Sequence, residues 1–291
     1  MAAWWTTLNQ IGLEKVFLLL MGPIFMACMA FEAWWLNRRQ QQTYTVKGTA
    51  INTSLALSHA VADGIAWALL VGLFDLIYQH RLFNIAITWW SVVGLLVAQD
   101  FCYYWFHRAS HRVRWMWASH VTHHSGETMN LSTALRQSPT YPISGMWVFW
   151  LPLAWLGFET RHVILVVAVS LAYQFFVHTE SVRKLPRWFE AVFNTPSHHR
   201  VHHARNPQYL DRNYAGVLII WDKLFGSFVP EEAPCDYGIV KQIHTHNPLV
   251  MMFHEWQAMG RDARRPGPLW LRLKHLWAPP DWERVERKAR R

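Results

Sequence analysis

The chain has 291 residues, 52% of them hydrophobic, and a formal net charge of +9. Its three cysteines, Cys28, Cys102 and Cys235, are too few and too far apart for a disulfide framework or a cysteine-based zinc site. Basic residues that gather beside a membrane explain the charge without a nucleic-acid partner. Long, nearly uncharged apolar runs between Val16 and Val177 exclude an ordinary soluble domain and favour an integral membrane protein.

Five apolar stretches approach the roughly 20 residues that a helix needs to cross a bilayer. They lie at residues 16–36, 54–78, 83–106, 142–158 and 162–177. The second contains His59 and Asp63, and the fourth is short, so we expect four or five membrane spans. Arg38 and Arg39 follow the first span and Arg108 follows the third, which places both of these loops in the cytosol.

The chain is expected to return to the cytosol near His178, and everything after it to stay on that side. We therefore predict an all-α fold: an integral membrane bundle of four or five transmembrane helices with a cytosolic helical cap that carries a histidine-rich dinuclear metal site. One membrane-embedded domain is expected over residues 1–291, with a catalytic region at 100–230 and a basic cytosolic tail at 231–291. The membrane is either a bacterial inner membrane or the endoplasmic reticulum.

Histidines are concentrated in the middle of the chain, where eight of the 17 form three clusters. The clusters are His107-x3-His111, His120-x2-His123-His124 and His199-x2-His202-His203. Residues three and four apart lie on one face of a helix, so each cluster is expected to present a single stripe of imidazoles. For any single histidine, a hydrogen-bonded core residue is the alternative. Eight rings buried together would need many partners, which favours a metal site.

The choice of metal stays open on chemical grounds. Imidazole suits zinc, copper, iron and nickel. A single zinc ion needs only three or four ligands, and the HExxH helix of zinc proteases is absent from the sequence. Two zinc ions or two iron ions would both fit the number of histidines.

The three clusters, with apolar spans between them, resemble the histidine boxes of the fatty acid hydroxylase and sterol desaturase superfamily. Three further segments are similar to the branch that includes alkylglycerol monooxygenase. They are Phe176-Val-His178-Thr-Glu180, Asn194-Thr-Pro-Ser-His198-His199-Arg-Val-His202-His203 and Asn213-Tyr-Ala-Gly-Val-Leu-Ile-Ile-Trp-Asp222-Lys-Leu-Phe-Gly226. The resemblance is close over roughly residues 100–230 and is limited to hydropathy on either side.

The resemblance implies a membrane oxidoreductase that holds two iron ions, takes dioxygen as co-substrate, and hydroxylates or desaturates a lipid C–H bond. The alkylglycerol branch further implies oxidation of an ether lipid with a tetrahydropterin as electron donor, whereas most relatives use an external electron-transfer protein. In either case the donor is separate from this chain. The rivals are a desaturase or hydroxylase of a sterol, carotenoid or fatty acyl chain, and a membrane protein that binds or transports zinc.

The expected iron ligands are the eight cluster histidines and His178, since a histidine between the second and third boxes is a metal ligand in relatives. The complete set is His107, His111, His120, His123, His124, His178, His199, His202 and His203. His198 is left open. Carboxylates often orient ligating histidines through their second ring nitrogen, and Asp100, Glu180 and Asp222 are the candidates for this role, with Asp211 a weaker one.

Overall fold

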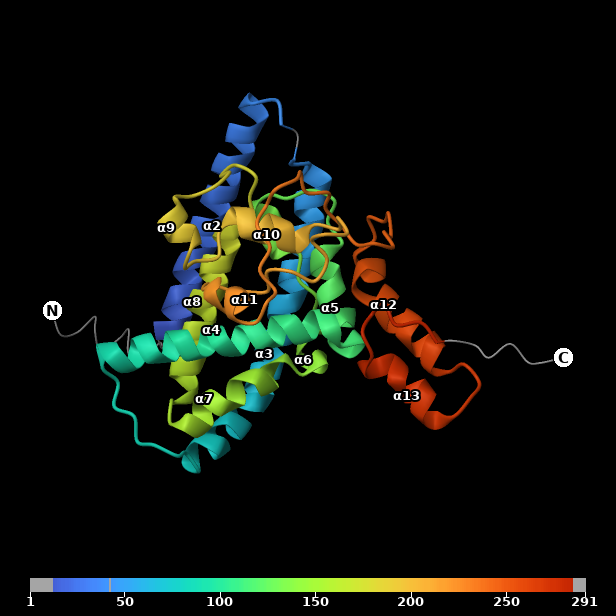
Figure 1. Ribbon diagram of the computed structural model, residues 1–291. Helices are drawn as coiled ribbons and strands as arrows, with labels where there is room; N and C mark the ends of the chain where they lie inside the picture. Colours follow the sequence, from blue (N-terminus) through green and yellow to red (C-terminus); the bar gives the residue numbers. More distant parts are fainter. Residues whose placement is uncertain (1–12, 42, 285–291) are drawn as a thin grey trace.

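The computed structural model describes residues 13–41 and 43–284, and this part of the chain is built of helices (Figure 1). The helices are α2 (Leu13–Arg38), α3 (Val46–Gln79), α4 (Trp89–Arg112), α5 (Arg114–His124), η1 (Leu131–Leu135), α6 (Tyr141–Ser144), η2 (Met146–Trp150), α7 (Leu151–Leu156), α8 (Thr160–Val177), α9 (Arg187–Glu190), α10 (Pro196–His203), α11 (Ile220–Leu224), α12 (Pro248–Ala263) and α13 (Leu269–Trp277). Besides them, the described residues contain two isolated β-bridges and no strand. The predicted all-α class is confirmed. Residues 285–291 of the predicted basic tail lie outside the described residues.

Three of the described helices are long and apolar enough to cross a membrane. They cover Leu19–Arg38, Val46–Gln79 and Thr160–Val177, and they coincide with the first, second and fifth predicted spans. The predicted span at 83–106 corresponds to α4, which begins only at Trp89 and continues through the first histidine cluster to Arg112. In Figure 1, α4 lies across the upright helices α2, α3 and α8.

The predicted span at 142–158 is not a single helix, which corrects the expectation from its hydropathy. Its residues form α6, η2 and α7, with turns at Gly145 and Gly157. Both glycines have positive φ, of 84° and 127°. A Cβ atom at Gly157 would lie 2.2 Å from the carbonyl oxygen of Phe83, so only glycine fits where these two segments cross. An apolar run alone does not reveal such breaks.

Side-chain contacts show which helix ends lie together. Near the C-terminal end of α2, Glu32 accepts a hydrogen bond from Thr179, the second residue after α8. At the opposite end of α8, Thr160 donates to Asp75 near the C-terminal end of α3. Helices α2 and α8 therefore end on one side of the bundle, which is also the side where α3 begins. The histidine-bearing helices α5 and α10 lie toward this side in Figure 1.

The largest apolar core lies between α3, α4, α7 and α8. Phe74, Leu95, Trp150 and Val163 are each at most 2% exposed within it. Burying a large apolar side chain stabilises a fold by about 1.5–3 kcal/mol. This core therefore fixes α4 against the upright helices, and with it the two histidines at the end of α4.

Candidate metal centre

Nine buried histidines gather in two groups at one end of the bundle. The first group is His107, His111, His120, His124 and His202, and the second is His123, His178, His199 and His203. Within each group the candidate ligand nitrogens lie within 4.8 Å of one another. These are the nine histidines proposed as ligands from the sequence, although their role as ligands stays a prediction.

The expectation that each cluster forms a single stripe is only partly met. In α5, His120 and His124 belong to the first group, but His123 points into the second. In α10 the arrangement is reversed, because His199 and His203 belong to the second group and His202 to the first. The histidines four apart in each helix stay in one group. His123 and His202 directly precede the last histidine of their clusters and are rotated from it by about 100° around the helix. Helices α5 and α10 thus connect both groups.

In the first group the Nε2 atoms approach one another closely. His120 Nε2 lies 3.0 Å from His107 Nε2 and 3.0 Å from His124 Nε2. The Nε2 atoms of His111 and His202 are buried without a hydrogen-bond partner among the described residues. All five rings therefore direct a nitrogen toward one small volume.

The second group repeats this arrangement. His178 Nε2 lies 2.8 Å from His199 Nε2 and 3.2 Å from His123 Nε2. His203 Nε2 lies 3.1 Å from His199 Nε2. His178 ends α8, so this group joins one candidate membrane helix to α5 and α10.

The opposite ring nitrogens of several of these histidines pair with backbone carbonyls, and this pairing determines where the ring hydrogens are. His107 Nδ1 donates to the Tyr214 carbonyl at 2.7 Å, and His178 Nδ1 donates to the Gln174 carbonyl at 2.6 Å. His202 Nδ1 donates in the same way to a carbonyl at 2.9 Å. A neutral imidazole carries one hydrogen, so the Nε2 atoms of these rings present bare lone pairs.

Converging lone pairs at about 3 Å repel one another, and neutral rings have no hydrogens left to place between them. Protonating the rings would instead put several positive charges in one buried place. A metal ion in each group resolves both difficulties, because it accepts every lone pair that is directed at it. The donor set therefore fits two metal ions bound through imidazole nitrogen.

The electrostatic environment keeps the rings in the form that binds metal. Burial lowers the pKa of each of the nine histidines below the ordinary value for this side chain. For His178 the pKa falls to about 4, with burial the dominant cause. Neighbouring histidines lower the pKa of several others further. The rings are therefore neutral at physiological pH, as a metal ligand requires.

Of the predicted orienting carboxylates, Asp222 is linked to a histidine through the backbone. Its two oxygens accept the backbone N–H groups of Tyr214 and Ala215, both at 2.8 Å. The Tyr214 carbonyl in turn accepts from His107 Nδ1. Asp222 therefore holds the peptide that fixes the orientation and the tautomer of His107.

Asp100 fixes the next part of the same loop. It accepts the backbone N–H groups of Val217 and Leu218, at 2.8 and 2.9 Å, and the indole N–H of Trp221 at 2.9 Å. A Cβ atom at Gly216 would lie 2.9 Å from Asp100 Oδ1, so the close approach of this loop requires glycine. Asp100 ties α4 to the loop that carries the carbonyl partner of His107.

The other two carboxylates differ from each other. Glu180 accepts a hydrogen bond from the Tyr237 hydroxyl at 3.0 Å, and no contact with the nine histidines is found for it in the described chain. Asp211 lies 3.7 Å from His111 Nδ1. The orienting role predicted for Glu180 therefore has no contact to support it, whereas the weaker candidate Asp211 has one.

Glu32 is a buried acid that lies outside the predicted site residues. It is 4% exposed and accepts hydrogen bonds from the Tyr44 hydroxyl, the Leu131 backbone N–H and the Thr179 and Ser181 hydroxyls. These bonds connect α2 to the segment after His178. An acid within an apolar span is the signal that could have identified it.

His198, which the sequence left open, belongs to neither group. It is 3% exposed, its ring packs against Phe228, and its Nδ1 atom has no hydrogen-bond partner among the described residues. Its neighbour His199 lies in the second group. A rotation of about 100° between adjacent helix positions separates the two rings.

A cavity of about 520 Å³ leads to both histidine groups. It is lined mainly by apolar side chains of α2, α3, α4 and α8, and His120 of the first group and His123, His178 and His199 of the second also face it. This volume lies within the range of about 300–1,000 Å³ typical of small-molecule sites. The cavity therefore offers an apolar compartment that ends at the candidate metal ligands.

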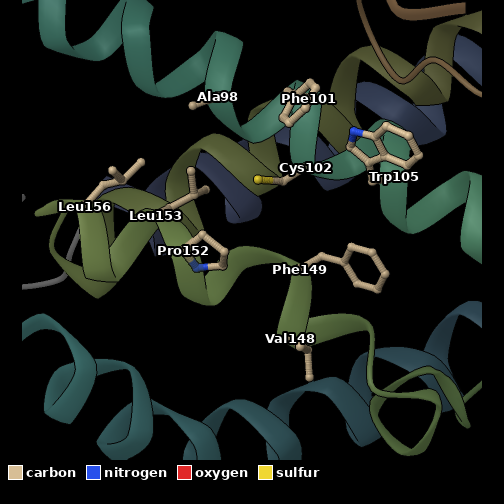
Figure 2. Close-up of a pocket in the computed structure, with 9 residues that line it drawn as sticks. All are labelled: Ala98, Phe101, Cys102, Trp105, Val148, Phe149, Pro152, Leu153 and Leu156. Carbon is tan, nitrogen blue, oxygen red and sulfur yellow. The ribbon is translucent and has the colours of Figure 1, made fainter. Parts of the chain in front are cut away.

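A second pocket, of about 440 Å³, contains no histidine. Figure 2 shows its nine lining residues, which come from α4 and from the η2 and α7 segment. They are Ala98, Phe101, Cys102, Trp105, Val148, Phe149, Pro152, Leu153 and Leu156. None of these side chains carries a charge and Cys102 contributes a single thiol, so this pocket mainly offers packing to an apolar chain.

The described residues are helical, three of their helices are apolar and long enough to cross a membrane, and nine buried histidines gather together. These features indicate a histidine-rich membrane protein. Residues 92–227 match the family model described as fatty acid hydroxylase. Over these residues the match confirms the resemblance to the fatty acid hydroxylase family seen in the histidine spacing. No solved structure matches the chain.

Curated relatives carry related activities in their names. Human alkylglycerol monooxygenase is 48% identical over 179 residues, which cover 60% of this chain and 39% of that protein. The alkylglycerol monooxygenase of Danio rerio is 42% identical over 195 residues, or 67% of this chain and 42% of that protein. An ornithine lipid hydroxylase of Rhizobium tropici is 26% identical over 243 residues, or 76% of this chain and 68% of that protein. The chain thus spans about two fifths of the length of the alkylglycerol monooxygenases it matches.

Proposed function

We propose that this protein is a di-iron lipid monooxygenase that uses dioxygen to hydroxylate a C–H bond, and that its substrate is an ether lipid of the alkylglycerol type. The observation that carries the proposal is the convergence of two sets of histidine Nε2 atoms at the end of an apolar cavity. The similarity to named alkylglycerol monooxygenases supports the class of substrate.

Each histidine group would hold one iron ion: five residues offer nitrogens to the first and four to the second. Bound iron would supply the reduction of dioxygen and the removal of hydrogen from the substrate. The protein supplies neutral imidazoles, a loop fixed by Asp100 and Asp222, and a mostly apolar cavity. It also holds the lipid tail so that one carbon faces the histidine groups.

The proposed reaction is hydroxylation of the carbon bonded to the ether oxygen by dioxygen. One oxygen atom enters the C–H bond next to the ether oxygen, and the other leaves as water with two electrons and two protons from a separate reductant. A hydroxyl on that carbon makes a hemiacetal, which breaks into an alcohol and an aldehyde. The reductant is either a tetrahydropterin or an external electron-transfer protein.

We also propose that the histidine groups lie at the cytosolic side of the membrane. Arg38 ends α2, Arg39 follows it, and Lys47 lies at the start of α3, which is the bundle end that carries the histidines. Basic residues favour the cytosolic side. Helices α2, α3 and α8 would then cross the membrane, and α5 and α10 with the segments around them would form a cytosolic cap.

Metal analysis and product analysis on the same preparation test this function. The full-length protein is purified without oxygen after growth with isotopically enriched iron, and its iron content and Mössbauer spectrum are recorded. It is then given an alkylglycerol, dioxygen and a tetrahydropterin. We expect two coupled irons per chain and release of a fatty aldehyde. Tightly bound zinc without iron would overturn the di-iron proposal, and a hydroxylated or desaturated lipid without aldehyde would overturn the ether-lipid substrate.

A further inference from the structure

The wall of the cavity that leads to the histidine groups is mostly apolar, but besides those histidines it contains polar side chains, among them Gln137, Gln174 and a patch on α3 and α6. Tyr141, His59 and Asp63 form this patch, and all three line the cavity. His59 and Asp63 are one turn apart on α3, and Tyr141 begins α6. The His59 and Tyr141 rings are in edge contact, with centroids 5.6 Å apart.

The patch begins at a proposed iron ligand. The Tyr141 hydroxyl lies 2.5 Å from His120 Nδ1. With iron on His120 Nε2, the ring hydrogen is on Nδ1, so the ring donates and the Tyr141 oxygen accepts. The hydroxyl hydrogen of Tyr141 is then free, because within the described residues this oxygen has no other hydrogen-bond partner. A donor thus faces the cavity beside the metal site.

His59 and Asp63 add an acceptor. His59 Nδ1 lies 3.0 Å from the Ser138 carbonyl and must donate to it, since a carbonyl cannot donate. His59 Nε2 lies 3.4 Å from Asp63 Oδ2, so a single proton is shared between the ring and the carboxylate. His59 is the one hydrogen-bonding or ionic partner found for the Asp63 carboxylate in the described chain. Its remaining oxygen is available to accept a hydrogen bond inside the cavity.

Tyr141 is buried, and the side chains of His59 and Asp63 are partly buried, at 20% and 25% exposure. Polar groups in such places usually have partners, because leaving one unpaired costs free energy. A donor and an acceptor side by side in an apolar cavity match a ligand that carries an acceptor oxygen and a hydroxyl close together. No lysine or arginine lines the cavity among the described residues, so the part of the ligand that enters is uncharged. An ether oxygen next to a hydroxyl-bearing carbon has this chemistry.

We infer that Tyr141 and the His59–Asp63 pair determine which carbon of the lipid is oxidised. Tyr141 donates a hydrogen bond to the ether oxygen, and Asp63 accepts one from the neighbouring hydroxyl. The alkyl tail then fills the apolar part of the cavity, and the carbon bonded to the ether oxygen lies next to the histidine groups. This inference rests on the proposed function for its substrate, and it assigns recognition to residues outside the metal-binding set.

Two lipids of the same shape distinguish the proposed hydrogen bond of Tyr141 from that of Asp63. Ethylene glycol monododecyl ether carries an ether oxygen and a hydroxyl, and dodecyl propyl ether replaces that hydroxyl with a methyl group. Binding to the full-length, metal-loaded protein is measured in detergent by calorimetry, and the metal content of every variant is recorded. The variants are Asp63→Asn, Tyr141→Phe and, as matched control, Asp75→Asn. Asp75 lies further along α3, bonds Thr160 and does not line the cavity.

For Asp63→Asn we expect about tenfold weaker binding of the hydroxyl-bearing lipid, as for the loss of a bond to a charged group, with dodecyl propyl ether unaffected. Tyr141→Phe should weaken binding of both lipids equally, and Asp75→Asn neither. Equal loss for both lipids in Asp63→Asn, or no loss, would overturn the inference. Because binding is measured without turnover, a wild-type protein that shows this pattern but releases no aldehyde would refute the proposed function alone.

Discussion

The carboxylate of Asp222 accepts the backbone N–H of Tyr214 at 2.8 Å, and the carbonyl of the same Tyr214 accepts the ring hydrogen of His107 at 2.7 Å. Tyr214 thus links the buried Asp222 carboxylate to His107, a proposed iron ligand. Asp222 is fully buried and also accepts from the Ser227 hydroxyl. Loss of this carboxylate should therefore affect metal binding although Asp222 touches no metal ligand.

We expect Asp222→Asn to lower iron affinity by about 10–100-fold, as changes behind a metal ligand usually do. The asparagine amide has only one acceptor oxygen, so it cannot accept all three donors. Iron affinity is measured by competition with a chelator. Asp236→Asn is the matched control, since Asp236 is an exposed partner of Arg205 and should leave iron binding unchanged. Equal iron affinity in both variants would show that this loop does not orient His107.

His123 and His124 are adjacent in the chain but belong to different groups. His123→Ala should remove iron mainly from the second group and His124→Ala mainly from the first, each leaving about half of the iron. Mössbauer spectra of the two variants should then differ, because the remaining iron has a different set of ligands. His254→Ala, a change in a histidine outside both groups, should keep the full iron content. Identical spectra for the first two variants would contradict the division into two groups.

Glu32→Ala should destabilise the protein and loosen the second group. It leaves the Leu131 N–H and the Thr179 and Ser181 hydroxyls without their acceptor, at a cost of about 3 kcal/mol or more in total. Thr179 follows His178, so iron in the second group should be lost first. Thermal unfolding of the solubilised protein and its iron content measure both effects. Glu283→Ala, at an exposed ion pair with Lys241, is the control, and an equal unfolding temperature for both variants would refute the prediction.

The ionisation of Glu190 should make the stability of the fold depend on pH. Burial raises the pKa of Glu190, but hydrogen bonds from the Ser197 hydroxyl, the Leu185 N–H and the Thr195 hydroxyl, with the charge of His198, outweigh it and lower the pKa below the ordinary 4.5. A lowered carboxyl pKa in the folded state stabilises the fold above the unfolded-state pKa. That contribution is lost as pH falls through the lowered pKa of the folded state.

The variant Glu190→Gln should therefore unfold at a slightly lower temperature than the wild type at neutral pH. The difference should shrink as the pH falls below the ordinary glutamate value and vanish in stronger acid, where both side chains are uncharged. Melting curves of the two proteins over a pH series check this. If the difference in unfolding temperature grows toward acid pH, the pKa of Glu190 in the folded state is not lowered.

The sequence was sufficient to predict the helical class, the three long apolar helices and the set of histidines that gather. Helix periodicity and bilayer thickness are local constraints, so hydropathy and spacing reveal them. The predicted span at 142–158 failed because Gly145 and Gly157 adopt left-handed turns, and a hydropathy average does not register backbone conformation. The role of Asp100 and Asp222 in orienting histidines stays a prediction, and their partners are mainly backbone N–H groups that only the folded loop brings to them.

The spacing of the three histidine clusters by itself predicted that their rings would gather, because residues four apart share a helix face. Only the tertiary structure decided that His123 and His202 each cross to the group opposite their neighbours, since this depends on how α5 and α10 face each other. The same holds for Tyr141, His59 and Asp63. They form one polar patch only because α3 and α6 pack together across a cavity, and no local pattern records a contact between segments so far apart.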